Sequence, residues 1–458
     1  MGPDADPPDP AAGEWARAVR VEEDTGLEEE LGPRLQGASG QRPISVTDLT
    51  NPRAAYWRRR TRLPKPPIVQ ARLDAGVRWH LWLGAQLGPG TALEVRVRRD
   101  GIIGQIDALT EVPIELKTTS GAVRVDDLAR ARPDYVEQLG MYCGLLGRTA
   151  GRLSVLQTRG DELVDAHVAD LAFHDPAALW TEARRRAQAL RTAWKEGRPT
   201  DLPRCAWFER GCEFRREQVC SCTGTEGEGP SPILAGLAAV VEDREAGERW
   251  RAAAQVREGQ APAVVQRFRD LLYPRRAYFE RTRPAAPEGR ADQPEAGSDP
   301  IRNRLSEALE SGPPGELARY APRTEEPEET VPVYRGQPYL LRVWRTRSLP
   351  LAEEIRARQP QYAIELGFRC ASLGENRAWL FLAGQPEGSG PVPLRVVSYS
   401  FDPVTPFSRL WRERARDLAR TLKDQAPSRL SPCPGWMARD CRFQPECGCP
   451  SESGRLQR

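Results

Sequence analysis

The stretch that decides the fold reads Gly101-Ile-Ile-Gly104-Gln-Ile-Asp107, followed shortly by Pro113-Ile-Glu115-Leu-Lys117. Alternating apolar and polar positions with β-branched residues predict two strands joined by a short turn. Because residues i and i+2 of a strand point to the same face, Glu115 and Lys117 project together, and Asp107 on the neighbouring strand can meet them. Two carboxylates and an ammonium on one strand pair are typical of a Mg²⁺ and water site, in which the lysine orients or deprotonates the water.

A second stretch matches this one without its chemistry. It reads Gln337-Pro338-Tyr339-Leu340-Leu341-Arg342. When the two stretches are aligned on their prolines, Leu340 replaces Glu115 and Arg342 replaces Lys117. The second half of the chain therefore lacks the carboxylate and the lysine.

The similarity between the two halves extends well beyond these strands and indicates an internal repeat. Asp48–Trp57 matches Asp270–Phe279, and Ala131–Cys143 matches Ala357–Cys370. Each half then ends in four cysteines, which are Cys205, Cys212, Cys220 and Cys222 in the first half and Cys433, Cys441, Cys447 and Cys449 in the second. We infer two tandem copies of one domain of roughly 190 residues.

This repeat predicts the domain organisation. Residues 1–40 are rich in Pro, Asp, Glu and Gly, a composition that predicts disorder. The first copy should span residues 41–225 and the second 262–452, with a helical linker at 226–261 and a tail at 453–458.

Composition limits the classes of protein that the chain can represent. At 458 residues and 39% hydrophobic, it can bury two cores. Neither a membrane-spanning run nor a signal peptide is visible, so we expect a cytoplasmic protein that does not enter a membrane. Ten cysteines in such a protein indicate metal sites rather than disulfides.

The net charge of +3 excludes a basic protein that coats nucleic acid. Two arginine runs, Arg58–Arg60 and Arg184–Arg186, could hold phosphates, or they could lie on solvated helix faces. Of the 67 basic residues only four are lysines. A lysine can act as a base when its pKa is lowered, whereas arginine cannot, so the choice of lysine at position 117 favours chemistry there.

Two predicted helices add candidate site residues. Val125–Leu146 is amphipathic, and Gln138 and Tyr142, four residues apart, share one of its faces. A second helical run, Leu73–Leu87, contains His80. Taken alone, His80 is typical of a packed or hydrogen-bonded histidine and Asp107 of a turn residue, but their order along the chain favours a shared site.

The ordered series Gly-x-x-x-His, Gly-x-x-Asp, Glu-x-Lys and Gln-x-x-x-Tyr, followed by clustered cysteines, resembles the RecB-type branch of the PD-(D/E)xK nucleases. It is most similar to the iron–sulfur members, such as the CRISPR-associated RecB-like exonucleases. The resemblance covers about residues 45–225, and a degenerate version covers about residues 265–452. It implies an α/β fold with two tandem restriction-endonuclease-like domains, each a mixed central sheet flanked by helices with a cysteine cluster at its end.

The resemblance also implies a role for each matching residue. His80, Asp107 and Glu115 would bind Mg²⁺ or Mn²⁺ with help from the Leu116 carbonyl. Lys117 would position or activate the attacking water. Gln138 and Tyr142 would contact the substrate phosphate and the lysine. The reaction would be phosphodiester hydrolysis by a deoxyribonuclease, of exonuclease type, acting on single-stranded DNA or DNA ends in repair, recombination or CRISPR-type processing.

The cysteines depart from the family pattern. Iron–sulfur members place one cysteine in an early Cys-Pro-Arg segment, where this chain has Asn51-Pro52-Arg53 and Tyr273-Pro274-Arg275. Each terminal set instead contains four cysteines, which suit a four-iron, four-sulfur cluster or a structural zinc equally well. The resemblance favours two iron–sulfur clusters per chain. Cys143 and Cys370 are expected to be core residues.

The second copy is expected to be catalytically inactive. His80 aligns with Arg304, Gln138 with Glu365 and Tyr142 with Arg369. Its three arginines Arg304, Arg342 and Arg369 could form a phosphate-binding cleft. Two other hypotheses remain open. One is a DNA-binding scaffold subunit of a larger DNA-processing complex with a vestigial site, and the other is RNA as the substrate.

Overall fold

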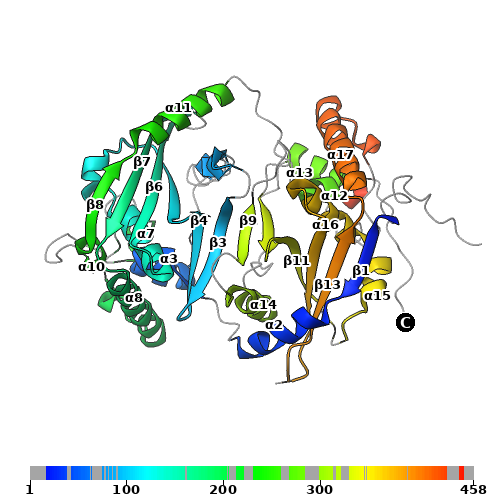
Figure 1. Ribbon diagram of the computed structural model, residues 1–458, viewed down its shortest axis with the longest axis horizontal. Coiled ribbons are helices and arrows are strands. Elements are labelled where there is room, and N and C mark those ends of the chain that lie inside the picture. The colour runs from blue at the N-terminus through cyan, green and yellow to red at the C-terminus, as the bar shows by residue number, and fades with distance from the viewer. Residues whose placement is uncertain are drawn as a thin grey trace, which may run out of the picture. The chain divides into compact units, whose positions relative to one another are not determined.

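The computed structural model describes residues 17–38, 43–61, 63, 75–76, 79–80, 82–84, 86–88, 91–159, 162–203, 205, 213–220, 231–258, 268–283, 299–312, 316–320, 330–344, 346, 348–388, 390–430 and 443–447. The chain divides into two compact units. The first unit comprises Arg42–Pro262 and Leu309–Ala321, and the second comprises Met1–Gln41, Ala263–Ala308 and Pro322–Arg458. Each is a mixed α/β structure (Figure 1).

The first unit is built on a mixed sheet with the strand order β9-β3-β4-β5-β6-β7-β8, and β2 pairs beside β4. These strands are β2 (Ile44–Ser45), β3 (Ala92–Arg99), β4 (Ile102–Leu109), β5 (Pro113–Thr119), β6 (Ala150–Arg159), β7 (Glu162–Phe173), β8 (Leu237–Glu242) and β9 (Leu317–Tyr320). The pairs β5–β6 and β2–β4 are parallel, and the other pairs are antiparallel.

Helices cover both faces of this sheet. Their bounds are α3 (Val46–Thr50), α4 (Pro52–Arg60), η1 (Val125–Asp127), α6 (Leu128–Ala131), α7 (Pro133–Leu146), α8 (Pro176–Glu196), η2 (Pro199–Asp201), α9 (Glu213–Arg216), α10 (Pro232–Ala235) and α11 (Arg244–Glu258). One core cluster joins the sheet to α3, α7 and α8. Another joins it to α11 and to the helical residues around Trp79. The α7 helix is the crossover between the parallel strands β5 and β6.

The second unit has the strand order β1-β13-β12-β11-β10. Its strands are β1 (Val19–Glu23), β10 (Val331–Tyr334), β11 (Gln337–Val343), β12 (Arg377–Ala383) and β13 (Leu394–Phe401). The pair β11–β12 is parallel, and the helix α16 (Pro360–Leu373) is its crossover. The other helices are α2 (Thr25–Gly37), α12 (Phe268–Leu272), α13 (Pro274–Thr282), α14 (Pro300–Glu310, of which residues 300–308 belong to this unit), α15 (Ala352–Arg358), α17 (Thr405–Asp424), η4 (Pro427–Arg429) and α19 (Gln444–Cys447).

The two units repeat one succession of elements. In each, two short helices precede an antiparallel strand pair, β4–β5 or β10–β11, and then a 14-residue helix starting at a proline, a strand parallel to the last one, an antiparallel strand and a long helix follow. The first unit has one more strand, β3, before this pair. The crossover helices α7 and α16 both end at a left-handed glycine, Gly147 and Gly374. Glycine suits these ends because it adopts a positive φ without a steric penalty.

The predicted disorder of residues 1–40 is wrong for the part that the structure describes. β1 pairs antiparallel with β13, and Asp24 caps α2 by accepting from the Leu27 amide. Gln36 exchanges two hydrogen bonds with the backbone of Val392, at 3.0 and 2.9 Å. The acidic composition misled the prediction because the partners of this segment lie more than 300 residues away. Residues 1–16 and the tail at 453–458 fall outside the described residues.

Two other boundaries change. The proposed linker 226–261 contains β8, which pairs with β7, and α11, which covers the sheet, so it belongs to the first unit. The helix expected over Val125–Leu146 is divided into η1, α6 and α7, because Pro133 cannot donate the hydrogen bond that would continue α6. None of the helices in the described part of the chain combines the length and apolar character that a membrane span requires.

Candidate active site

The site is centred on the place where β4 and β5 separate. These strands pair at Ala108 with Ile114 and at Leu109 with Pro113. Beyond that point the Leu116 amide donates instead to the carboxylate of Asp107, at 2.7 Å from Oδ2. The separation therefore brings Asp107 against β5, beside the face that carries Glu115 and Lys117.

Glu115 is a buried carboxylate whose two oxygens differ. Its side chain is 1% exposed, and Oε1 forms an ion pair with the Lys117 ammonium. Its other oxygen, Oε2, is buried and has no hydrogen-bond partner among the described residues. Burial, reinforced by the negative charge of Asp107, raises the pKa of Glu115 to about 8 despite the lysine. A buried oxygen without a partner, next to a second carboxylate, fits a bound cation.

Lys117 is held as a cation. Burial acts to lower its pKa, but the negative charges of Glu115 and Asp107 outweigh this effect and raise it. The ammonium also donates to Gln138 Oε1 at 2.9 Å. In the structure as described, Lys117 is therefore suited to donate hydrogen bonds to a water or a phosphate oxygen rather than to remove a proton.

Gln138 and Tyr142 continue the hydrogen bonds from Lys117 in one fixed direction. Gln138 accepts from Lys117 and donates through Nε2 to the Tyr142 hydroxyl at 3.1 Å. That hydroxyl donates to the Gln105 carbonyl at 2.7 Å. Burial raises the pKa of Tyr142 well above its ordinary value, so the phenol keeps its proton. The expected shared face of the two residues on α7 is confirmed.

Two further residues fit Tyr142 into place. A Cβ on Gly104 would lie 3.2 Å from the tyrosine ring and 2.5 Å from Leu145, so only glycine leaves room for this ring against β4. Thr47 on α3 lies near the Tyr142 hydroxyl and acts to lower its pKa. Gly104 belongs to the Gly-x-x-Asp motif, but no sequence signal distinguishes Thr47 from other threonines.

His80 reaches the same place from a separate helical segment. Its Nδ1 lies 3.8 Å from Oδ1 of Asp107, and its side chain is 37% exposed. The histidine, the two carboxylates and the lysine are therefore gathered as expected. Leu116 contributes its amide to Asp107, which leaves its carbonyl as the remaining candidate ligand. Carboxylate and carbonyl oxygens with one imidazole suit Mg²⁺ or Mn²⁺.

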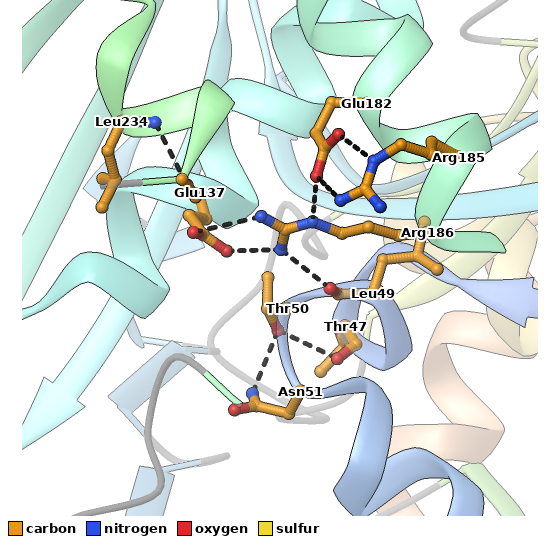
Figure 2. Close-up of polar contacts among 10 residues, drawn as sticks. Thr47, Leu49, Thr50, Asn51, Glu137, Glu182, Arg185, Arg186 and Leu234 are labelled. Carbon is orange, nitrogen blue, oxygen red and sulfur yellow. Dashed lines mark hydrogen bonds and ion pairs between the residues drawn. The ribbon is translucent and has the colours of Figure 1, made fainter. Parts of the chain in front are cut away.

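A buried ionic network holds the helices around this site (Figure 2). The Arg186 guanidinium on α8 binds Glu137 on α7 at 2.7 Å, Glu182 at 2.8 Å and the Leu49 carbonyl on α3 at 3.1 Å. All three side chains are nearly inaccessible. Glu137 is next to Gln138 on α7, and Leu49 lies two residues after Thr47 on α3. The network therefore holds α7 and α3 together beside Gln138 and Tyr142.

The two arginine runs act mainly within the fold. Besides the buried Arg186, Arg59 stacks 3.6 Å over the Trp194 ring and Arg60 donates to the Trp194 carbonyl. Arg58 pairs with Asp48, and Arg185 pairs with Glu182. The interpretation as phosphate sites therefore loses most of its basis, and the alternative of purely solvated faces is wrong for Arg186.

The matching place in the second unit contains a complete ion network. Arg342 on β11 donates to Glu365 Oε2 at 2.9 Å, and Arg369 donates to Glu365 Oε1 at 2.6 Å and to the Tyr339 carbonyl at 2.7 Å. Leu340, in the position of Glu115, is buried. One carboxylate therefore pairs with both Arg342 and Arg369 and leaves a net charge of +1. A phosphate-binding cleft formed by these arginines stays a prediction. Arg304 is half-buried on α14.

Three of the eight clustered cysteines lie among the described residues. Cys205 and Cys220 are buried together with Phe214 and Ala54, and the Cys205 sulfur accepts from the Ala54 amide on α4 at 3.3 Å. Cys447 is buried at the end of α19. The other five, Cys212, Cys222, Cys433, Cys441 and Cys449, lie outside the described residues. Among the described residues, no three His, Cys, Asp or Glu side chains are placed so that they could hold a metal ion together, and this applies to His80, Asp107 and Glu115 as well as to the cysteines. Cys143 and Cys370 are buried core residues, as expected.

In each unit one arginine donates hydrogen bonds to backbone carbonyls beside the cysteine segment. Arg53 on α4 donates to the carbonyls of Leu202 and Thr200, at 2.9 and 3.2 Å. Arg275 on α13 donates to the carbonyls of Leu430 and Cys447, at 3.2 and 3.0 Å. The Pro-Arg segments therefore lie beside the cysteine segments in both units, although neither carries a cysteine of its own.

No family model and no curated protein matches the chain. A solved structure described as the crystal structure of SSO0001 is similar to part of it, at 21% identity and a TM-score of 0.28, covering 43% of this chain and 97% of that one.

Proposed function

We propose that this protein is a metal-dependent nuclease that hydrolyses phosphodiester bonds of DNA, in single strands or at ends, at the first unit's site. The observation that carries the proposal is the buried Glu115 carboxylate. It lies beside Asp107 with one oxygen lacking a partner among the described residues, and burial, reinforced by the charge of Asp107, raises its pKa. A divalent cation would supply compensating positive charge.

The chain's own residues then divide the work. Asp107, Glu115, His80 and the Leu116 carbonyl would hold the metal, which would stabilise the charge that builds on the phosphate. Lys117, cationic and fixed by Gln138, would orient the attacking water by donating to it. Tyr142 would keep Gln138 turned with its carbonyl oxygen toward the lysine.

The second unit would contribute no chemistry. Its position equivalent to Glu115 is the apolar Leu340, and its Arg342 and Arg369 both form ion pairs with Glu365. The repeated succession of elements and the two Pro-Arg segments support a tandem duplication in which one copy kept the site. We propose that the second copy serves as a structural or binding module for a cytoplasmic enzyme that works with other DNA-processing proteins.

We also propose one metal centre at each cysteine set, an iron–sulfur cluster in preference to zinc. Support comes from the burial of Cys205 and Cys220 in one cluster. In each unit an arginine, Arg53 or Arg275, also donates hydrogen bonds to the backbone near the cysteines. Thiolate ligation would fold these segments onto α4 and α13. Anaerobically purified protein should contain about eight irons and absorb broadly near 400 nm. A colourless protein with about two zincs would change the assignment from iron–sulfur clusters to zinc, and a protein with neither metal would refute the metal centres.

The activity is tested with end-labelled single- and double-stranded DNA, with Mn²⁺ and with EDTA. Cleavage should require the metal and should be lost in Glu115→Gln, a variant that keeps the side chain's size and removes its charge. A protein that binds DNA but never cleaves it would instead support the scaffold hypothesis. Cleavage of RNA in preference to DNA would change the substrate.

A further inference from the structure

The residue before the crossover helix differs in charge between the units. In the first unit it is Arg132, which forms an ion pair with Asp134 at 3.0 Å and 3.2 Å, with side chains 5% and 11% exposed. In the second unit the equivalent residue is Gln359, and its partner is Gln361, which donates to it. The backbone angles of Arg132 and Gln359 agree within a few degrees, at φ −139°, ψ 59° and φ −134°, ψ 55°.

The second unit thus shows that a neutral pair can start this helix. Burying an ion pair costs desolvation free energy that its attraction only partly offsets. The start of α7 alone therefore does not explain the charged pair. Like Glu115 and Lys117, the charge of Arg132 is present only where the candidate active site is present.

The contacts of Arg132 lead to that site. Its guanidinium carbon lies 3.4 Å from the centre of the Tyr135 ring, and the Lys117 ammonium lies 5.6 Å from the same centre. Arg132 also donates to Thr119 Oγ1 at 3.4 Å, two residues beyond Lys117 on β5. It therefore contacts both the ring that borders the lysine and the strand that carries it.

We propose that Arg132 is a positioning residue for Lys117. It holds the Tyr135 ring and the end of β5, and through them keeps the lysine ammonium facing Glu115 and the site of the reacting phosphate. The inference depends on the proposed function for its kinetic consequence, but the placement of the lysine can be measured without any activity.

The test replaces Arg132 and Asp134 together by glutamine, the pair that the second unit uses. We expect the melting temperature to stay within about 3 °C of the parent protein. The value of kcat should fall about tenfold with KM nearly unchanged, because a displaced lysine weakens the transition state and not substrate binding. The reverse exchange in the second unit, Gln359→Arg with Gln361→Asp, is the matched control and should leave both constants unchanged.

A double-mutant cycle shows whether Arg132 acts through Tyr135. Tyr135→Leu should lower kcat by a similar factor, and the combined variant should lose no more than either alone. Losses that multiply would overturn the proposal, as would an unchanged kcat in the Gln pair variant. Arg132→Lys keeps a charge beside Asp134 but lacks the planar stack, so it should also lose activity. This variant decides the question if the Gln pair variant does not fold.

Lysine NMR separates this inference from the proposed function. With only four lysines in the chain, selective ¹³C-lysine labelling gives few signals, and Lys117→Arg identifies that of Lys117. The Gln pair variant should shift the Lys117 side-chain signal and leave those of Lys195 and Lys423 in place. An unmoved Lys117 signal would refute the positioning role even in a protein that cleaves nothing. A shifted signal in an inactive protein would keep the positioning role and reject only the nuclease.

Discussion

The same place in the two units carries opposite charge. In the first unit two carboxylates, Asp107 and Glu115, face one ammonium, which gives a net charge of −1 when all are ionised. In the second unit the two guanidiniums of Arg342 and Arg369 share one carboxylate, that of Glu365, which gives +1. The first set leaves a buried oxygen without a partner, whereas in the second both carboxylate oxygens are paired.

The surroundings of these two sets differ much less than the sets themselves. Arg186 on α8 donates to the Leu49 carbonyl, and Arg414 on α17 donates to the Leu271 carbonyl, at 3.1 Å in both units. Residues that hold helices together are thus retained, while residues that would touch a cation are exchanged as a group. The two sets therefore differ in charge and in whether every carboxylate oxygen is paired, which is the difference that the proposed function requires.

The strongest test of this difference replaces the equivalent residue of each unit, Lys117 and Arg342, by alanine. Lys117→Ala should lower cleavage by about 10²–10³-fold, because it removes a preorganised donor from the reaction site. Arg342→Ala should leave kcat unchanged. Initial rates on end-labelled single-stranded DNA with saturating Mn²⁺ give both values. Equal losses from the two variants would show that the second unit takes part in the chemistry.

A second test uses the strands that flank the repeated elements. The first unit pairs β7 with β8, which follows it in sequence, whereas the second pairs β13 with the distant β1. Deleting residues 1–38 should uncover β13, destabilise the second unit and promote aggregation through the open edge. Calorimetry should show the second unit's transition lowered or lost while the first unit's remains. Two unaltered transitions would contradict the assignment of β1 to the second unit.

Stability measurements sharpen the contrast between the two polar networks. Glu365→Ala leaves the nearly buried Arg369 without its carboxylate and should destabilise the second unit by about 3 kcal/mol. Gln138→Ala removes neutral and charge-assisted hydrogen bonds and should cost the first unit only about 1–2 kcal/mol. Chemical unfolding of each variant measures both. A larger loss of unfolding free energy in Gln138→Ala than in Glu365→Ala would contradict the prediction that the second unit's network contributes more to stability.

The smallest expected effect concerns pH. Burial and the charge of Asp107 raise the pKa of Glu115 to about 8, so protonation of this carboxyl competes with a metal ion below that pH. Mn²⁺ affinity should therefore rise with pH by up to about tenfold per unit and level off above about pH 8. Titration calorimetry in two buffers of different ionisation enthalpy should detect the released proton. In Glu115→Gln the pH dependence should be reduced, and an unchanged slope there would exclude this carboxyl as the source.

Local patterns in the sequence were sufficient for much of the site. Alternation predicted β4 and β5, and helical spacing put Gln138 and Tyr142 on one face, because both signals depend on residues close in sequence. The order of motifs placed His80 near Asp107, where the structure has it.

Features that depend on distant partners could not be predicted in this way. The charge-rich segment around β1 and α2 has the composition of a disordered chain, yet its partners are Val392 and β13. Arg342 and Arg369 resemble free phosphate ligands until Glu365 is seen between them. The sequence contains each of these residues, but only the tertiary structure determines which charge neutralises which.

The pairing of β1 with β13 also has a consequence for synthesis of the protein. Val19 must find Phe401, which is made 382 residues later. At bacterial or eukaryotic elongation rates that interval lasts roughly 20–75 s. The first unit's strands through β8 all emerge within it, so they can pair while β1 is still waiting. The nascent residues of β1 therefore spend that time without their partner strand, and a pause or chaperone contact near residue 401 would affect when the second sheet closes.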